Sequence, residues 1–403
     1  MNQMGVAVVG CGVVGSGVVK MLTQNRAKIA RAAGCDVRLK YIVDIKEVAA
    51  PEGTVVTADF DLVLADPEVQ VIVETIGGAG IALKFTQRAL EMGKSVVTSN
   101  KELVATSGDA FKALACEKNA WYLYEAAVCG GVPVLRPIKT CLAGNHITRL
   151  SGIVNGSTNY LITRMVESGM SFQAALGEAK ELGYVEQNPD ADILGLDARR
   201  KLAILANAAF GAKLSDDALI PTEGIAHLNV RDMVCAKALG GQVKLIAHAE
   251  RVQDNWTGWV RPAWVANEHP LAMVKDVFNG LCVTGDCVEE VMFYGRGAGM
   301  MPTASAIVGD LIEMARAPES PISFDAEADA PAFVKPDRCL ARLAMRVEEG
   351  VLALCDAMPI DRVESRGAMT AVLTREAPLG ELLQKAAGLA QVGVQAGIPL
   401  IVL

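Results

Sequence analysis

Lys201 follows Asp197 by four residues, in a run whose apolar residues Leu194, Ala198 and Leu205 recur at helical spacing. This spacing puts the lysine on the same stripe of the helix as the apolar side chains, where an ammonium group loses its water. Loss of hydration, or a second cation nearby, brings the pKa of a lysine into the range useful for proton transfer. The alternative is a surface ion pair, worth about 0.3–0.5 kcal/mol. The first interpretation makes Lys201 a candidate proton donor.

Three carboxylates, Glu186, Asp190 and Asp192, surround a proline turn shortly before this helix. They could hold an ammonium group, or they could form an ordinary solvated loop. A second cation is available at Lys101, in the run 98–101, which follows a predicted strand. Open α/β sheets bind their ligands at the carboxyl ends of their strands, so Lys101 is a candidate site residue as well as an ordinary helix-start lysine.

The run 10–15 reads Gly-Cys-Gly-Val-Val-Gly and lies between an apolar strand and a helix. The first glycine permits a tight turn, the second lets backbone approach a pyrophosphate, and the third permits close packing of helix and strand. The amino end of the helix adds positive potential. In this context the pattern predicts a dinucleotide site, whereas an empty glycine-rich turn is the alternative.

Asp44 ends the second predicted strand, where an acidic side chain accepts a hydrogen bond from a ribose 2′-hydroxyl and favours NAD. Lys46 follows two residues later and could instead bind a 2′-phosphate. The sequence therefore leaves the choice between NAD and NADP open.

The composition excludes several other classes of protein. The 403 residues are 51% apolar and 21% charged, with a net charge of −8 and no basic run, so we expect no nucleic-acid partner. No apolar run is long enough for a membrane span. The ten cysteines form no CxxC pair, which is typical of a reduced cytoplasmic protein, and the four dispersed histidines do not favour a transition-metal site.

Strand-like and helix-like runs alternate through residues 1–135, which predicts an α/β fold with a parallel, doubly wound sheet of the Rossmann type. From about Val134 the pattern changes, and we expect an α+β substrate and dimerisation domain over 136–297. A linker rich in proline and acidic residues spans Ala315–Pro331. Residues 332–403 predict a small β-α-β-β-α-β domain.

Six segments together resemble the homoserine dehydrogenase family, in order and at consistent spacing over almost all of residues 5–315. They read GCGVVGSG, TSNKELVA, EAAVCGGVPV, GIVNGSTNYLI, ELGYVEQNPDADILGLDARRKLAILA and EVMFYGRGAGMMPTASAIVGD. The resemblance implies reversible, NAD(P)-linked reduction of L-aspartate 4-semialdehyde to L-homoserine, in the biosynthesis of threonine, methionine and isoleucine. It also implies that residues 298–317 return to the nucleotide domain.

The family's residue roles carry over where the motifs match. Lys201 resembles the proton donor to the aldehyde oxygen, and Lys101 a second active-site lysine. The substrate contacts implied or expected are Glu186, Asp197, Asp192, Gly156 and Thr158. The cofactor contacts are Gly10, Gly12, Val13, Val14, Gly15, Asp44, Ser99, Lys101, Gly183, Gly299 and Thr303. A monovalent cation, Na⁺ in typical members, is expected on backbone oxygens of Glu125, Val128, Gly130 and Val132.

The tail resembles the ACT regulatory domain of some members, although Glu349-Gly350 stands where Pro-Gly is usual, so an amino-acid effector stays open. The family resemblance also implies a homodimer or homotetramer. Every candidate catalytic residue lies before Pro318, so removal of the tail is expected to leave activity measurable. The alternatives are another semialdehyde dehydrogenase, for which no matching Cys–His pair appears, and a catalytically silent cofactor-binding protein.

Cys129 lies between two of the cation-site positions. Two interpretations are open: a small core thiol, or a thiol made reactive by Lys101 and Lys201, in which case alkylation would block turnover.

Overall fold

The computed structural model describes residues 3–317, 330–366, 369–392, 394–397 and 399–403. The predicted linker lies mostly outside these residues. The chain forms two compact units, one from segments 1–144, 203–217 and 295–330, the other from 145–202, 218–294 and 331–403. Within the described residues, no helix has the length and apolar character needed to cross a membrane.

The first unit contains a six-stranded sheet in the order β3-β2-β1-β4-β5-β6, with every neighbouring pair parallel. Its strands are β1 (Gln3–Val9), β2 (Asp36–Val43), β3 (Val55–Thr57), β4 (Val71–Glu74), β5 (Ser95–Thr98) and β6 (Tyr122–Leu123). Its helices are α1 (Val13–Gln24), α2 (Arg26–Ala33), α3 (Phe60–Ala65), α4 (Gly80–Glu91), α5 (Lys101–Glu117), η1 (Glu125–Ala127), α6 (Leu135–Lys139) and α12 (Met300–Arg316). The predicted parallel, doubly wound sheet is confirmed.

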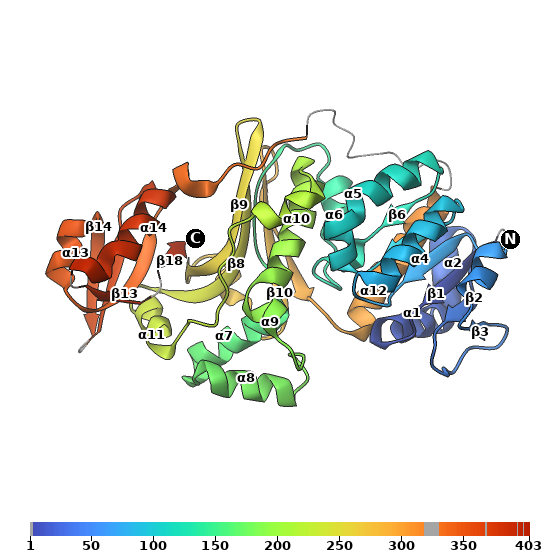
Figure 1. The fold of residues 1–403 in the computed structure, drawn as a ribbon, viewed down its shortest axis with the longest axis horizontal. Helices are drawn as coiled ribbons and strands as arrows, with labels where there is room; N and C mark the ends of the chain where they lie inside the picture. The colour runs from blue at the N-terminus through green and yellow to red at the C-terminus, as the bar shows by residue number, and fades with distance from the viewer. Residues whose placement is uncertain (1–2, 318–329, 367–368, 393, 398) are drawn as a thin grey trace. The chain divides into compact units, whose positions relative to one another are not determined.

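Helix α12 belongs to this unit although nearly 300 residues separate it from β1, and Figure 1 shows it in orange among the blue elements. Its apolar residues Ala304, Ile307, Val308 and Leu311 share one core with Val6 and Val8 of β1 and Val18 of α1. A Cβ atom on Gly17 would lie 2.8 Å from the carbonyl oxygen of Met300, so the glycine permits this close approach.

The second unit is built on a ten-stranded sheet in the order β11-β10-β7-β8-β9-β18-β13-β15-β14, with β17 paired to β13. The strands from the middle of the chain are β7 (Ile147–Ile153), β8 (Gly241–Val252), β9 (Asn255–Ala266), β10 (Phe278–Gly285) and β11 (Glu289–Arg296). The helices there are α7 (Gly156–Ser168), α8 (Phe172–Glu181), α9 (Asp190–Ile193), α11 (Val230–Ala238) and η3 (Pro270–Met273). Helices α10 (Leu196–Phe210) and η2 (Leu214–Leu219) pass from one unit to the other.

The C-terminal residues supply the other strands of that sheet. Their main elements follow the order β13 (Leu343–Glu349), α13 (Val351–Ala357), β14 (Ile360–Arg366), β15 (Met369–Thr374), α14 (Leu379–Gly388) and β18 (Leu400–Val402). Short elements between them are η4 (Pro336–Arg338), β12 (Leu340–Ala341), β16 (Ala377–Pro378), η5 (Leu389–Val392) and β17 (Gln395–Ala396). The main elements repeat the predicted β-α-β-β-α-β order, and the ACT assignment stays a prediction.

The C-terminal strands are continuous with the central ones. Strand β18 pairs in parallel with β9, Ile401 opposite Ala263, and Figure 1 shows the two side by side. One apolar core contains Ile246 and Trp259 from the centre together with Leu343 and Val372 from the C-terminal part. The two parts therefore share this core.

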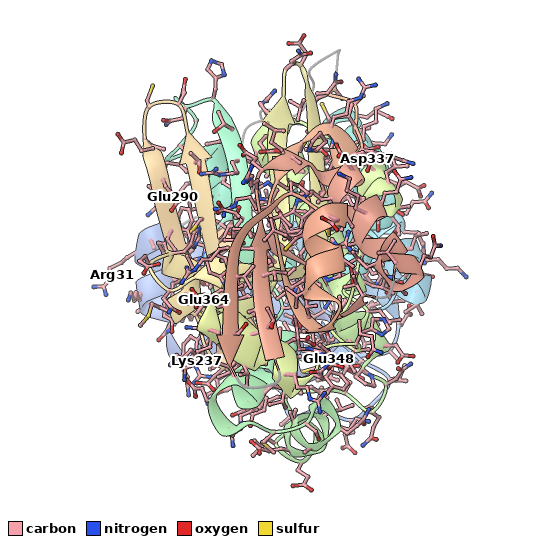
Figure 2. The ribbon with its side chains drawn as sticks, turned by 90° about the vertical axis from the view of Figure 1, so that its left-hand side faces the viewer. Arg31, Lys237, Glu290, Asp337, Glu348 and Glu364 are labelled. Carbon is pink, nitrogen blue, oxygen red and sulfur yellow. The ribbon has the colours of Figure 1, made fainter. Side chains whose placement is uncertain are left out.

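A buried ion pair adds to this connection. Arg346 of β13 donates from Nε to Asp232 Oδ1 of α11 at 2.9 Å, and both side chains are almost fully buried. Arg231 of α11 also pairs with Glu348 of β13. Figure 2 labels Lys237 on α11 and Glu348 on β13, and both lie towards the same end of the unit. Loss of one partner of such a pair leaves a buried charge and costs about 3–5 kcal/mol.

Removal of residues 331–403 is therefore expected to unfold the second unit or make it insoluble, contrary to the expectation from sequence alone. The deletion would expose the shared core and leave β9 without its neighbour β18, a strand edge prone to aggregation. Soluble yield and thermal unfolding by circular dichroism would measure this, with Arg346→Leu as a milder disruption of the same contact. A soluble truncated protein with the melting temperature and turnover of the full chain would contradict it.

Candidate active site

The glycine loop between β1 and α1 has the geometry of a phosphate cradle. Gly10 has φ +91°, and a Cβ on Gly15 would lie 2.0 Å from the oxygen of Gly10, so both positions exclude side chains. A Cβ on Gly12 would meet nothing within 4 Å, which leaves the loop open to a ligand there. Helix α1 begins at Val13, half-buried Val14 follows, and neither an acidic residue nor a side-chain cap occupies its first turn. These features fit a pyrophosphate at the helix N-terminus.

Asp44 follows β2 and holds this loop. Its Oδ2 accepts from the backbone N–H of Cys11 at 2.7 Å, and its Oδ1 accepts from that of Lys46 at 2.9 Å. These backbone donors lower the pKa of Asp44, so the side chain is an anion at neutral pH. Sequence reasoning gave Asp44 a role toward ribose; the structure adds a role in supporting the loop.

Ser99 and Asn100 lie between β5 and α5 at the carboxyl edge of the sheet, and Lys101 begins α5. Asn100 caps α5 by accepting from Leu103 N–H at 3.1 Å, and its amide donates to Gly78 O at 2.7 Å. Lys101 is the first residue of the helix. The cap therefore fixes the backbone that carries Lys101.

Glu74 supports the same edge and was missed by sequence reasoning. It is buried at the end of β4, where it accepts from Thr98 Oγ1 at 2.6 Å and from Ile76 N–H at 2.7 Å. Burial raises its pKa, although these hydrogen bonds act in the opposite direction. The available signal was a single carboxylate closing the apolar strand VIVE. Thr98 in turn accepts from Asn100 N–H at 2.9 Å, which links Glu74 to the α5 cap.

Gly299 and Thr303 lie at the start of α12 in the same unit as the glycine loop. Gly299 has φ +120° and precedes the first residue of the helix, and Thr303 is buried in the first turn. The structure thus brings two of the later predicted cofactor residues into the first unit. The other one, Gly183, belongs to the second unit, where it follows α8 with φ +73° and is exposed.

Lys201 in α10 is a buried ammonium group with two fixed acceptors. Its residue is 8% exposed, Nζ donates to Val154 O at 2.8 Å, and Asp197 Oδ2 lies 2.7 Å from Nζ. Asp197 is 2% exposed. The predicted helical pair is therefore an interior ion pair, not the surface pair that was the alternative.

Asn155 connects the carboxylates of this cluster. Its Nδ2 donates to Asp192 Oδ1 at 2.7 Å and to Asp197 Oδ2 at 2.8 Å, and its Oδ1 accepts from Thr158 N–H at 2.8 Å. One amide thus caps α7 and holds two carboxylates together. Sequence reasoning did not predict that this amide would bridge Asp192 and Asp197.

The remaining predicted substrate residues lie around the start of α7. Gly156 is its first residue, and Thr158 is buried one turn from the cap. Glu186 is exposed on the segment after α8, which is tied to α7 because Ser157 Oγ donates to Tyr184 O at 2.8 Å. The structure thus brings Asp192, Asp197, Lys201 and the α7 N-terminus into one cluster, with Glu186 on an adjoining loop.

The predicted cation segment 125–132 is buried in the first unit. The carboxylate of Glu125 accepts from the N–H groups of Val134 and Arg136, each at 2.6 Å, and so is committed to the start of α6. Val128 and Val132 have apolar side chains, which leaves main-chain oxygens as their available cation ligands. A Cβ on Gly130 would lie 2.4 Å from Gly297 O. In the described part of the chain, no group of three His, Cys, Asp or Glu side chains could hold a metal ion.

A cavity of about 570 Å³ lies along the edge strand β6. Its walls include Trp121, Tyr122 and Glu125, with α5 and α6 contributing Lys112 and Lys139. The glycine loop does not line it. The cavity therefore lies apart from the predicted nucleotide loop.

Cys129 is buried, with 1% of its surface exposed and φ +54°. A reagent in solution cannot reach its sulfur in this conformation. The structure favours the core-thiol interpretation over the reactive-thiol hypothesis.

Two family models match this chain. One is described as the NAD-binding domain of homoserine dehydrogenase and matches residues 10–125; the other is described as homoserine dehydrogenase and matches 133–312. The homoserine dehydrogenase of Pseudomonas aeruginosa is 38% identical over 88% of this chain and 84% of its own length. That of Bacillus subtilis is 38% identical over 77% of this chain and 73% of its own.

Solved structures agree with these sequence relatives. A homoserine dehydrogenase from Thiobacillus denitrificans superposes with a TM-score of 0.91 at 31% identity, covering 100% of this chain and 99% of its own. A hyperthermophilic archaeal homoserine dehydrogenase in complex with NADPH gives a TM-score of 0.64 at 26% identity, over 77% of this chain and 97% of its own.

We expect native protein treated with iodoacetamide to be labelled at Cys116, Cys141, Cys287 and Cys355, all of which are exposed, and not at Cys129. Peptide mass mapping after brief exposure would measure this. Labelling in denaturant is the control that every site can react. Modification of Cys129 as fast as Cys116 would show that the 125–132 segment opens in solution.

Proposed function

The chain belongs to the homoserine dehydrogenase family, and we propose that Lys201 is the proton donor in its reaction. The enzyme interconverts L-aspartate 4-semialdehyde and L-homoserine with NAD(P), a step of amino-acid biosynthesis. The observation that carries the proposal is the buried Nζ atom with its two acceptors, Val154 O and Asp197 Oδ2.

An ammonium group has three N–H donors, and two acceptors of Lys201 are fixed by the protein. The third donor is then available to the carbonyl oxygen of the substrate. In the reducing direction Lys201 gives a proton to this oxygen as charge develops on it; in the oxidising direction the neutral amine takes the proton back. NAD(P), when bound, supplies or accepts the hydride at its nicotinamide ring.

The same cluster can bind both the ammonium group and the carboxylate of the amino-acid substrate. Asp192 and Asp197, held by Asn155, create negative potential suited to the substrate ammonium group, and Glu186 can approach it from the adjoining loop. The first turn of α7 offers the N–H groups of Gly156 and Ser157 and positive potential to the substrate carboxylate, while the Thr158 N–H is held by the Asn155 cap. Lys101 we assign as a second lysine beside the nicotinamide and the substrate.

For the coenzyme we propose that Gly10, Gly12, Val13, Val14 and Gly15 bind the pyrophosphate. Ser99 and Lys101 would contact the nicotinamide side, and Gly183, Gly299 and Thr303 would complete the site. Asp44, an anion beside the ribose position, would disfavour the 2′-phosphate of NADP. Exposed Lys46 would attract the 2′-phosphate and so favour NADP.

Two further proposals concern a bound cation and the oligomeric state. Backbone oxygens of Glu125, Val128, Gly130 and Val132 would hold a monovalent cation; the burial of this segment and the commitment of the Glu125 carboxylate to α6 support this. We also propose a homodimer or homotetramer, on family resemblance.

Lys201→Ala should lower kcat about 100-fold or more, since general acid catalysis contributes about that much. Affinity for NAD(P)H should stay near that of the wild type. Steady-state assays with aspartate semialdehyde and fluorescence titration of the coenzyme measure the two quantities. The exposed Lys180→Ala is the matched control. Unchanged turnover in Lys201→Ala would refute the assignment.

Asp44→Asn should raise kcat/KM for NADPH relative to NADH about tenfold, because it removes a negative charge but keeps one acceptor for the loop. Asp44→Ala should weaken both coenzymes, since it also releases Cys11 N–H. Initial rates with each coenzyme measure the ratio. An equal loss for both coenzymes in Asp44→Asn would mean that Asp44 only supports the loop.

A further inference from the structure

Lys244 is the fourth residue of β8, and its amine lies inside the protein. It is 2% exposed, and its Nζ donates to Val274 O at 2.5 Å and to Asn159 Oδ1 at 3.4 Å. A lysine in such a place is costly unless its donors are satisfied. Nothing in the proposed chemistry at Lys201 uses it, so its retention in a strand requires another explanation.

Asn159 of α7 gathers the same stretch of chain. Its Nδ2 lies within hydrogen-bond distance of three carbonyl oxygens, those of Val274 (3.3 Å), Asp276 (3.0 Å) and Phe278 (3.2 Å). Asp276 has φ +52°, and its N–H donates to Thr163 Oγ1 at 3.1 Å. Lys244 and Asn159 therefore hold residues 274–278, here called the 274–278 segment, in one conformation against α7.

This segment touches the residue that begins α7. A Cβ on Gly156 would lie 2.7 Å from Val277 O, so the carbonyl of Val277 lies directly against Gly156. Asn159, which holds the segment, is itself only one turn from Gly156 on the same helix. A shift of the segment would therefore displace the first turn of α7, where the proposed function places the substrate carboxylate.

We propose that Lys244 is a positioning residue for substrate binding. With Asn159, it fixes the 274–278 segment, and Val277 in turn fixes the N–H groups at the start of α7. The inference rests on the proposed function of that helix N-terminus. The protonated amine suits this role best, because hydrogen bonds from a charged donor are about twice as strong as neutral ones.

The charges around the amine give the role a pH dependence. Burial lowers the pKa of Lys244 to about 8, and Lys275 on the segment adds to the shift. The carboxylates of Glu167, at the end of α7, and of Asp276, on the segment, raise the pKa of Lys244 and so oppose this shift. Glu167 also pairs with Lys275 at 2.7 Å. The charge on Lys244 is therefore lost as the pH rises through about 8.

Titration of Lys244 makes the folded protein more stable, not less, as the pH rises above about 8. The folded protein releases the Lys244 proton near pH 8, whereas the unfolded chain keeps it until about pH 10.4. Between these values the unfolded state binds more protons, so this group makes the protein more stable as the pH rises. If substrate affinity weakens above pH 8, the cause is therefore not that loss of the Lys244 proton unfolds the protein.

The test compares Lys244→Met, which keeps the length and apolar body of the side chain, with Lys275→Met. The latter removes a half-exposed lysine from the same segment. We expect Lys244→Met to raise KM for homoserine and for aspartate semialdehyde about tenfold, with kcat within about threefold of the wild type. Coenzyme affinity should not change, and Lys275→Met should keep a KM near that of the wild type at pH 7.5. Because Lys275 lowers the pKa of Lys244, its removal should move the rise in KM to higher pH.

A pH series separates positioning from a structural role. In the wild type, KM should rise between pH 7.5 and 9 more steeply than in Lys244→Met, and the difference between the two curves isolates Lys244 from the substrate's own amino group. If Lys244→Met does not fold, Asn159→Ser, which releases the segment from the other side, should show the same selective rise in KM.

Wild-type KM values in Lys244→Met, an equal loss of kcat, or parallel pH curves would each overturn the inference. For Asn159→Ser, an unchanged KM would do the same. Failure of the proposed role of the α7 N-terminus is distinguishable, because wild-type protein would then bind an analogue of homoserine that lacks the carboxylate as tightly as homoserine itself.

Discussion

The buried ammonium group of Lys201 constrains the rest of the substrate cluster. A charge in a protein interior must be paired and hydrogen-bonded, and here Asp197 supplies the opposite charge and Val154 a main-chain acceptor. Val154 follows β7 directly, so the acceptor is placed by the sheet and not by a flexible loop. Because two acceptors are fixed, the direction of the remaining N–H bond is fixed as well.

Each of these partners is held by a further part of the second unit. Asn155 binds Asp197 and caps α7, so the acid that pairs with Lys201 and the helix that would take the substrate carboxylate share one amide. The 274–278 segment leads into β10, is held by Lys244 of β8 and in turn supports α7. The C-terminal strands extend the same sheet through β9 and β18, which makes them part of the scaffold of the site.

Local sequence patterns predicted what depends on local chemistry. The alternation of strands and helices, the glycine spacing at 10–15 and the helical phase of Lys201 were all readable, because each reflects neighbours within a few residues. The interior position of Lys201 followed from the apolar residues on its own stripe.

Contacts between distant residues were not readable in this way. Lys244 stands in the apolar strand GQVKLIAHA, and its partners are 85 residues before it and 30 after it. Glu74 depends on Thr98, and Asn155 on two later aspartates. The tail had the signature of a separate domain because its own element order is self-consistent; its pairing with β9 depends on residues about 140 positions earlier. The burial of Cys129 likewise depends on the packing around its loop and not on its neighbours in sequence.

A crystal structure of the enzyme with NADP⁺ and homoserine would test the central claim most directly. The account predicts that the side-chain hydroxyl of homoserine lies about 2.6–3.2 Å from Lys201 Nζ, which is hydrogen-bond reach. Val154 O and Asp197 Oδ2 should keep their contacts with the same nitrogen. A hydroxyl bonded to another donor, with Lys201 still enclosed by Val154 and Asp197, would contradict the account.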